Sequence, residues 1–301
     1  LNSYLIIKMS GNIHGFGSGS NNNNNSNNNY RPVQMMGSVD NSSGNPREEN
    51  FFSFLKGVCC PYFTYKSVIF FVSCVDLIMY IITLCFGIKM DATELLAPTY
   101  STLDKFGMKV NNKIFHGQVW RWITFGLLHA NFVHIFVNLF SQLIIGSMIE
   151  KAIGSFNSGL LYLFSSIGGG IFSSVVADAS GVGASVAIFG MLGAYFGYMI
   201  INWKYLDRVL GPMNKFCNLI FMSFIVIMNI SYGFSNPIID NYGHIGGLIF
   251  GFFLIFVITK PVEENDGMCC GYKIWFYVSC VTLFILYVGG CLIFFLAKKI
   301  Q

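Results

Sequence analysis

Seven long apolar stretches limit what this chain can fold into more than any other feature of its sequence. They cover residues 68–88, 128–149, 158–177, 184–202, 216–234, 243–259 and 274–297. A helix of about 20 consecutive apolar residues is long enough to cross a bilayer, where the backbone must satisfy its own hydrogen bonds. Of the 301 residues, 54% are hydrophobic and only 11% are charged. The sequence therefore predicts an all-α fold, a polytopic transmembrane helical bundle.

The expected domain organisation has three parts. Residues 1–55 are rich in Asn, Ser and Gly and have too few apolar residues for a core, so they predict a disordered cytoplasmic tail, either neutral or regulatory. Residues 56–260 hold six spans as one core, and residues 261–301 hold a charged linker and a seventh span. The long first loop, 87–127, has room for structure of its own. Its Trp120-Arg121-Trp122 triplet is expected to anchor at the membrane interface.

Charge and cysteine placement give expectations about topology and location. The apolar run at residues 4–7 is too short for a signal peptide, so the first span is expected to target the chain. If the N-terminus is cytoplasmic, most of the lysines that are not in the first loop lie on the inner side of the membrane. The net charge of +4 is spread over many loops, which predicts no nucleic-acid partner. Four cysteines form two adjacent pairs that suit reversible palmitoylation as well as free thiols: Cys59, Cys60, Cys269 and Cys270.

Polar side chains inside the spans are costly in hydrocarbon and therefore mark candidate functional residues. The candidates are Asp76, His129, His134, Asn138, Ser185 and His244. Counted from the inner end of each helix at 1.5 Å per residue, Ser185, His244 and His134 lie roughly 24, 22 and 21 Å up. Their helices all begin on the same side of the membrane, so the three side chains are expected at one level. Asn138 lies one turn deeper, on the face that carries His134.

A hydroxyl and an imidazole at matched depth provide a nucleophile and a general base, the minimum for acyl transfer. Ser185 and His244 are the predicted pair, and His134, Asn138 and the Ser185 backbone N–H are possible donors to a tetrahedral oxyanion. Gly183 would allow a tight turn just before the nucleophile. No cofactor or metal is expected. A serine alone in a membrane helix usually serves packing, so the prediction rests on the residues together.

The remaining polar residues have simpler interpretations. Asp76 either neutralises a partner inside the bundle or lies near a water-filled cavity. His129 is expected near the interface, with hydrogen bonds to the first loop. Glycines at Gly193-x-x-x-Gly197 and Gly247-x-x-x-Gly251 permit close backbone contact, which makes spans four and six the expected central pair.

These motifs together resemble the rhomboid proteases. The resemblance runs over about residues 120–251 and rests on Trp120-Arg121, His129-x-x-x-x-His134-x-x-x-Asn138, Glu150, Gly183-Ala184-Ser185 and Gly243-His244-Ile-Gly-Gly247. It implies a Ser185 nucleophile, a His244 base and oxyanion donors at His134 and Asn138, with no acidic third member. It further implies single-span membrane-protein substrates, cleaved in the outer part of their transmembrane segment. The six-plus-one layout resembles members from the eukaryotic secretory pathway, which predicts location there or at the plasma membrane.

Two positions depart from the family pattern. Val186 follows the serine where many members have a small residue, and Phe189 stands where bacterial members have a Tyr packed on the base histidine. Phe189 is still expected to stack on His244.

The same residues also bear on other possible functions. The main alternative is a proteolytically inactive rhomboid-like protein that binds or traffics membrane-protein clients. A transporter would need charges through the depth of the bundle or inverted repeats. Zinc and aspartyl intramembrane proteases would need His-Glu-x-x-His or paired membrane aspartates, and neither motif is present.

Overall fold

The computed structural model describes residues 62, 64–89, 94–235, 239–262 and 269–297. The chain divides into residues 1–31 and residues 32–301, and the fold described here belongs to the second unit. The predicted tail, together with Cys59 and Cys60, lies outside the described residues, as do the side chains of Cys269 and Cys270.

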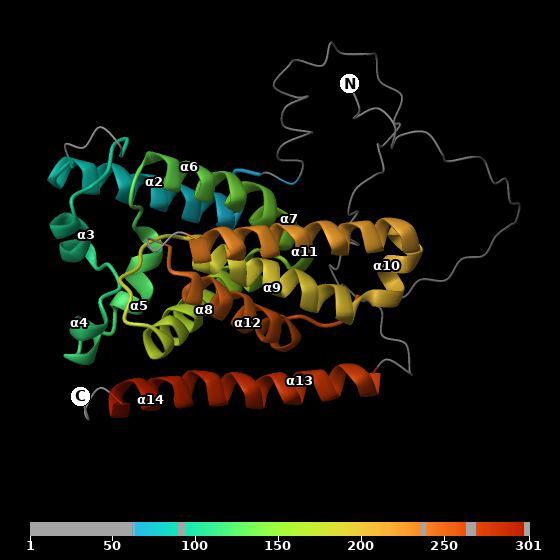
Figure 1. The fold of residues 1–301 in the computed structure, drawn as a ribbon. Coiled ribbons are helices and arrows are strands. Elements are labelled where there is room, and N and C mark those ends of the chain that lie inside the picture. The colour runs from blue at the N-terminus through green and yellow to red at the C-terminus, as the bar shows by residue number, and fades with distance from the viewer. Residues whose placement is uncertain (1–61, 63, 90–93, 236–238, 263–268, 298–301) are drawn as a thin grey trace, which may run out of the picture. The chain divides into compact units, whose positions relative to one another are not determined.

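The described residues form a succession of helices joined by mostly short loops (Figure 1). In chain order they are α2 (Val68–Phe86), α3 (Tyr100–Phe106), α4 (Asn111–Phe115), α5 (Arg121–Thr124), the 3-10 turn Phe125–Leu127, α6 (Phe132–Ser141), the π-helix Gln142–Gly146, α7 (Ser147–Ile153), α8 (Ser155–Val176), α9 (Ser185–Ile201), α10 (Trp203–Leu210), α11 (Pro212–Ser235), α12 (Asn241–Ile258), α13 (Cys269–Phe284), the π-helix Ile285–Gly289 and α14 (Gly290–Ala297).

The length and composition of these helices confirm an all-α multi-pass membrane protein. Within the described residues, six helical segments are long and apolar enough to span a bilayer: Val68–Phe86, Phe132–Ile153, Ser155–Val176, Pro212–Phe234, Asn241–Ile258 and Gly271–Ala297. The predicted fourth span is α9, which bends by 88° into α10 and brings the total to as many as seven. The second span begins later than predicted because Asn131 caps α6 by accepting the His134 N–H.

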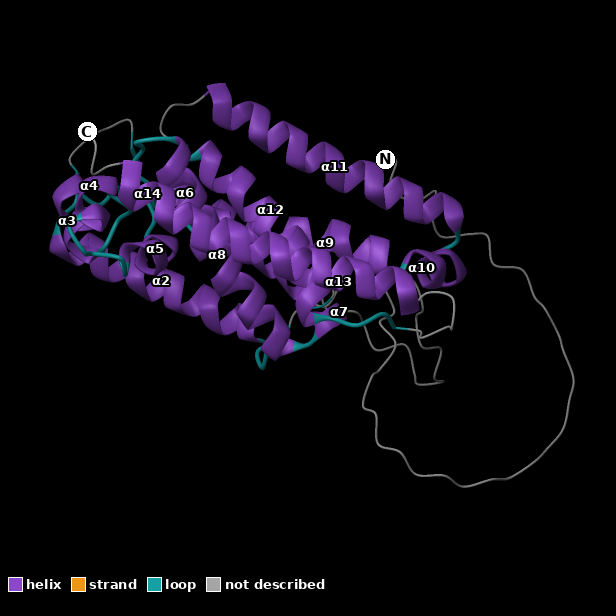
Figure 2. Cartoon of the chain, turned by 90° about the horizontal axis from the view of Figure 1, so that it is seen from below, coloured by secondary structure: helices purple, strands orange, loops and turns teal. Residues whose placement is uncertain are grey.

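Helices α9 and α12 form the centre of the bundle, as the glycine spacing predicted. They pack on each other and on α8. Their backbones touch: a Cβ built on Gly251 would lie 1.9 Å from the Gly190 carbonyl oxygen, and one on Gly193 would lie 2.0 Å from the Leu248 carbonyl oxygen. Helix α11 lies at the edge of the bundle (Figure 2) and exposes most of its surface.

The first loop folds into α3, α4 and α5, and its Trp-Arg-Trp triplet does not act as predicted. Arg121 is 4% exposed, and its guanidinium donates to Asp104 Oδ1 and to the Met108 carbonyl oxygen. Trp122 is also buried and donates from Nε1 to Ser174 Oγ at 3.0 Å. Interfacial anchoring is therefore wrong for both residues, which instead hold the loop together and fasten it to α8. Trp120 alone of the three is exposed.

Polar contacts also hold the outer helices to the core. The Glu150 carboxylate accepts the Val68 and Ile69 N–H groups at 2.9 and 3.1 Å, which fixes the start of α2. In the seventh span, the Tyr287 hydroxyl donates to the Phe164 carbonyl oxygen of α8 at 2.6 Å. Tyr287 lies in the π-helix that joins α13 to α14.

Candidate active site

Ser185 and His244 come together at the start of the two central helices. Ser185 is the first residue of α9, and His244 lies in the first turn of α12. His244 Nε2 and Ser185 Oγ are 2.7 Å apart, which is hydrogen-bond distance. His244 is 9% exposed, whereas Ser185 is partly exposed. The geometry suits proton transfer from the hydroxyl to the imidazole.

Contact between the helix backbones sets the separation of these two side chains. A Cβ built on Gly247 would lie 2.2 Å from the Val186 carbonyl oxygen, so α9 and α12 touch within one turn of both reacting groups. Gly247 is three residues beyond His244, and Val186 follows Ser185 directly. Helices this close leave little freedom for the Ser185–His244 distance to vary.

The two residues that depart from the family pattern both pack tightly here. Phe189 stacks on His244 with ring centroids 4.4 Å apart and an interplanar angle of 5°, as predicted. Val186 is 2% exposed, and its methyl groups fill the space where Gly169 and Gly243 lack side chains. Neighbouring glycines therefore make room for the larger residue at position 186.

A tight turn at Gly183 leads into the nucleophile. Its φ of +128° lies in the range that favours glycine, as the sequence predicted. The Gly183 N–H donates to the Phe125 carbonyl oxygen at 3.0 Å. A Cβ on Gly183 would lie 2.8 Å from His134 Nε2, so the turn passes directly against that ring.

His134 lies next to this turn with its ring held by its own chain. The Ala130 N–H points at His134 Nδ1 over 3.4 Å. A nitrogen that accepts this hydrogen bond carries no proton, so the proton of the neutral ring is on Nε2. That nitrogen is the one facing Gly183 and is available as a donor beside Ser185.

Asn138 is buried and donates from Nδ2 to the His134 carbonyl oxygen at 2.8 Å. One of its two amide N–H groups is thus bonded to its own helix. The other amide proton is left as a donor, and the oxyanion role predicted for Asn138 and His134 stays a prediction.

His129 does not behave as predicted. It is fully buried in the protein, and its ring packs edge-on against His134 with centroids 5.3 Å apart. Neither ring nitrogen has a hydrogen-bond partner among the residues that the structure describes. His129 therefore supports the His134 ring by packing, not by bonding to the first loop.

Asp76 lies away from Ser185 and His244, in a polar cluster of its own. Its Oδ2 accepts from Gln142 Nε2 at 2.8 Å, and Gln142 also contacts the Tyr162 hydroxyl at 2.6 Å. The partner of Asp76 inside the bundle is thus the neutral amide of Gln142. Sequence reasoning overlooked Gln142, although a glutamine within an apolar span was a visible signal.

Sequence reasoning also missed an ion pair next to the candidate site. Lys109 Nζ lies 2.7 Å from Asp240 Oδ2, and Asp240 is the N-cap of α12. An aspartate four residues before a membrane histidine is a capping signal that could have been noticed.

Comparison with known proteins relates the sequence to one family. The family model described as Rhomboid domain matches residues 116–261. Rhomboid-like protease 1 of Toxoplasma gondii is 35% identical over 211 residues, 68% of this chain and 68% of that protein. Rhomboid protease GluP of Bacillus subtilis is 38% identical over 166 residues, 55% of this chain and 31% of that protein.

RHOMBOID-like protein 6, mitochondrial, of Arabidopsis thaliana is 38% identical over 172 residues, 56% of this chain and 54% of that protein. The chain spans about half the length of several curated relatives that it matches. By its fold and site, this chain is a multi-pass helical membrane protein with a serine and a histidine in hydrogen-bond contact. The chain belongs to the rhomboid family.

Proposed function

We propose that this chain is an intramembrane serine endopeptidase that acts through Ser185 and His244. The observation that carries the proposal is the 2.7 Å contact between Ser185 Oγ and His244 Nε2 at the head of the two central helices. Relatives named as proteases in Toxoplasma gondii and Bacillus subtilis support it further.

In the proposed reaction, His244 Nε2 takes the Ser185 hydroxyl proton as Oγ attacks the scissile carbonyl carbon. The carbonyl π electrons move to oxygen, and the resulting oxyanion accepts hydrogen bonds from His134 Nε2, the Asn138 amide and the Ser185 backbone N–H. The protonated His244 then gives its proton to the leaving amine, and the C–N bond breaks. Water, deprotonated by His244, hydrolyses the acyl-enzyme and restores Ser185.

The proposed substrates are single-span membrane proteins. A peptide carbonyl inside a membrane helix is hydrogen-bonded within that helix and cannot reach Ser185. Substrates are therefore expected to carry Gly, Ser or Pro near the outer end of their span, where the helix can unwind. Palmitoylation of the cysteine pairs, a cytoplasmic N-terminus and a secretory or plasma-membrane location remain predictions.

A cleavage assay tests the proposal directly. The purified full chain in liposomes is incubated with a panel of single-span reporters, alongside Ser185→Ala and His244→Ala. Ser223→Ala in α11 is a matched control, since it removes a hydroxyl from a membrane helix that carries neither Ser185 nor His244. We expect cleavage by the wild type and the control only. Equal cleavage by Ser185→Ala would refute the nucleophile role of Ser185, and no cleavage of any reporter would favour the client-binding alternative.

A fluorophosphonate probe provides a second readout, because it reacts covalently with an activated serine. We expect labelling of the wild type and its loss in Ser185→Ala and His244→Ala.

A further inference from the structure

A buried lysine–aspartate pair lies beside the active site, and the proposed mechanism leaves it unused. The Lys109 side chain is 0% exposed and that of Asp240 is 7% exposed. Removing two charges from water is expensive, and such a pair often contributes little net stability. A role in fixing one particular geometry is therefore worth testing.

Lys109 connects the first loop to the segment that leads into the nucleophile. Its backbone forms two hydrogen bonds with Gly181, Lys109 N to Gly181 O at 3.0 Å and Gly181 N to Lys109 O at 3.1 Å. Gly181 lies four residues before Ser185. A Cβ on Gly181 would lie 2.9 Å from Asp240 Oδ2, so this segment rests directly on the ion pair.

Asp240 connects the same pair to the helix that carries the base. Its Oδ1 accepts the Gly243 N–H at 2.9 Å and the Ser173 hydroxyl at 2.6 Å. Its carbonyl oxygen accepts the His244 N–H at 3.2 Å. The carboxylate therefore determines where α12 begins, and with it where His244 lies.

The charge on Asp240 is maintained by these contacts. Burial alone would raise the pKa of this carboxyl, but the Lys109 charge and the hydrogen bonds from Lys109, Ser173 and Gly243 hold the pKa below its usual value. Lys109 Nζ also donates to Ser173 Oγ, which fixes the ammonium against the end of α8.

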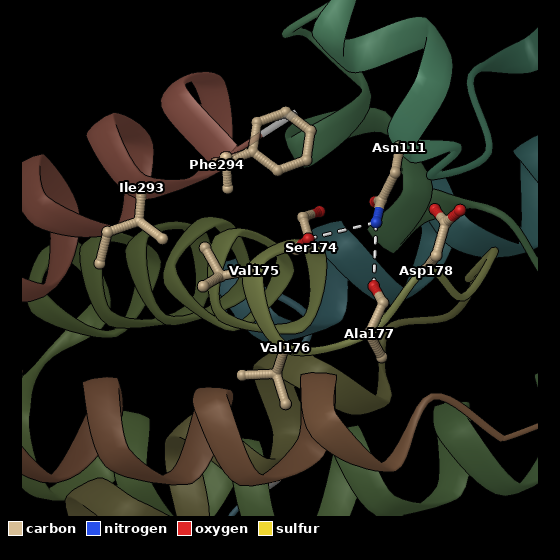
Figure 3. Close-up of a pocket in the computed structure, with 9 residues that line it drawn as sticks. Asn111, Ser174, Val175, Val176, Ala177, Asp178, Ile293 and Phe294 are labelled. Carbon is tan, nitrogen blue, oxygen red and sulfur yellow. Dashed lines mark hydrogen bonds between the residues drawn. The ribbon is translucent and has the colours of Figure 1, made fainter. Parts of the chain in front are cut away.

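The loop that presents Lys109 is itself fastened to α8. Figure 3 shows Asn111, two residues further along, with its amide directed at the end of that helix. Asn111 Nδ2 donates to the Ser174 and Ala177 carbonyl oxygens at 3.2 and 2.9 Å. These hydrogen bonds fix the backbone next to Lys109 against α8, so its side chain can position the segment before Ser185 and the start of α12.

We propose that Lys109 and Asp240 are positioning residues that hold the segment before Ser185 and the N-terminus of α12 in the register that brings Ser185 and His244 into contact. The proposal rests on the proposed function for its catalytic consequence. Neither residue touches the reacting atoms. The pair acts through the turn on one side and through the helix cap on the other.

The test compares Lys109→Met, the double variant Lys109→Met/Asp240→Asn, and Lys113→Met. Lys113→Met is the matched control, because Lys113 lies in the same loop and pairs with Asp104 at the surface. Lys109→Met leaves a buried carboxylate without its cation, so it is expected to lower both thermal stability and kcat. The double variant removes both charges, while the amide oxygen introduced at position 240 can still accept the Gly243 N–H.

We expect the double variant to regain most of the thermal stability while its kcat stays on the order of 100-fold below the wild type, because small displacements of reacting groups are costly. KM should change little in this variant. Lys113→Met should match the wild type in both parameters. Wild-type kcat in the double variant, or in Lys109→Met, would overturn the proposal. If Lys109→Met does not fold, the double variant decides alone.

Amide hydrogen exchange keeps this test separate from the proposed function. Peptides covering residues 181–185 and 240–247 should exchange faster in Lys109→Met and in the double variant, but not in Lys113→Met. Unchanged exchange in both segments would overturn the positioning role. Absence of Ser185-dependent cleavage in every form would refute the protease function, and the exchange data would still decide the role of the pair.

Discussion

Replacing Gly247 with alanine should separate the two central helices next to the candidate active site. The new Cβ would lie 2.2 Å from the Val186 carbonyl oxygen, about 1.2 Å short of the 3.4 Å at which ordinary contact begins. The opposing atom belongs to the backbone of α9 and cannot rotate away. The helices must therefore move apart by about 1 Å at the level of Ser185 and His244.

A shift of that size would break the contact on which the proposed chemistry depends. The Oγ–Nε2 distance of 2.7 Å would open to about 3.7 Å, beyond hydrogen-bond range. Displacements of about 1 Å can lower a rate on the order of 100-fold. Overpacking of this kind typically destabilises a protein by about 1–3 kcal/mol, so folded protein should persist and the loss should fall on catalysis.

The assay measures kcat/KM on a single-span reporter together with the rate of fluorophosphonate labelling. Gly159→Ala is the matched control, because its Cβ would meet only Val68 Cγ2 at an ordinary 3.5 Å. We expect both rates to fall in Gly247→Ala and to stay at the wild-type level in Gly159→Ala. Wild-type rates in a folded Gly247→Ala protein would refute the idea that backbone contact sets the Ser185–His244 distance.

Individual contacts support three further predictions. Phe189→Ala removes the ring stacked on His244, and since such pairs are worth about 0.5–1.5 kcal/mol, kcat should fall by up to about tenfold; an unchanged kcat would contradict this. Gln142→Leu leaves the buried Asp76 carboxyl without its amide partner and should lower the free energy of unfolding by about 1–3 kcal/mol. Thermal or SDS denaturation measures this loss, and an unchanged stability would mean that the polar cluster does not depend on Gln142. The pKa of Asp240 is lowered in the fold, so its contribution to stability is complete above the ordinary carboxyl pKa and is lost as pH falls through the lowered value. The difference in Tm between wild type and Asp240→Asn should therefore narrow below about pH 4. A difference that stays constant with pH would refute this prediction.

The structure also suggests why Val186 is compatible with this site. Its side chain occupies space that Gly169 and Gly243 leave open, and its carbonyl oxygen contacts Gly247. A larger residue after the serine therefore comes with glycines on the facing helices. Because the wild type carries Val186, the cleavage assay on the wild type tests whether the site is active with valine at this position.

The sequence by itself determined the class of fold and the set of polar residues worth considering. Hydropathy is a local property, so the apolar stretches predict the spans without knowledge of their neighbours. Helical rise per residue is constant, so counting along each helix is enough to predict a similar depth for Ser185 and His244. Glycine spacing likewise indicated that α9 and α12 would touch.

Only the tertiary structure decided the partners of the polar side chains outside the Ser185–His244 pair. Arg121 belongs to the interior of the first loop, Gln142 bonds to Asp76, and Lys109 reaches Asp240 across 131 positions of sequence. Such pairs join segments far apart in the chain, and no local spacing or periodicity records them. Burial makes each contact matter, because a polar group withdrawn from water must find its partner within the protein.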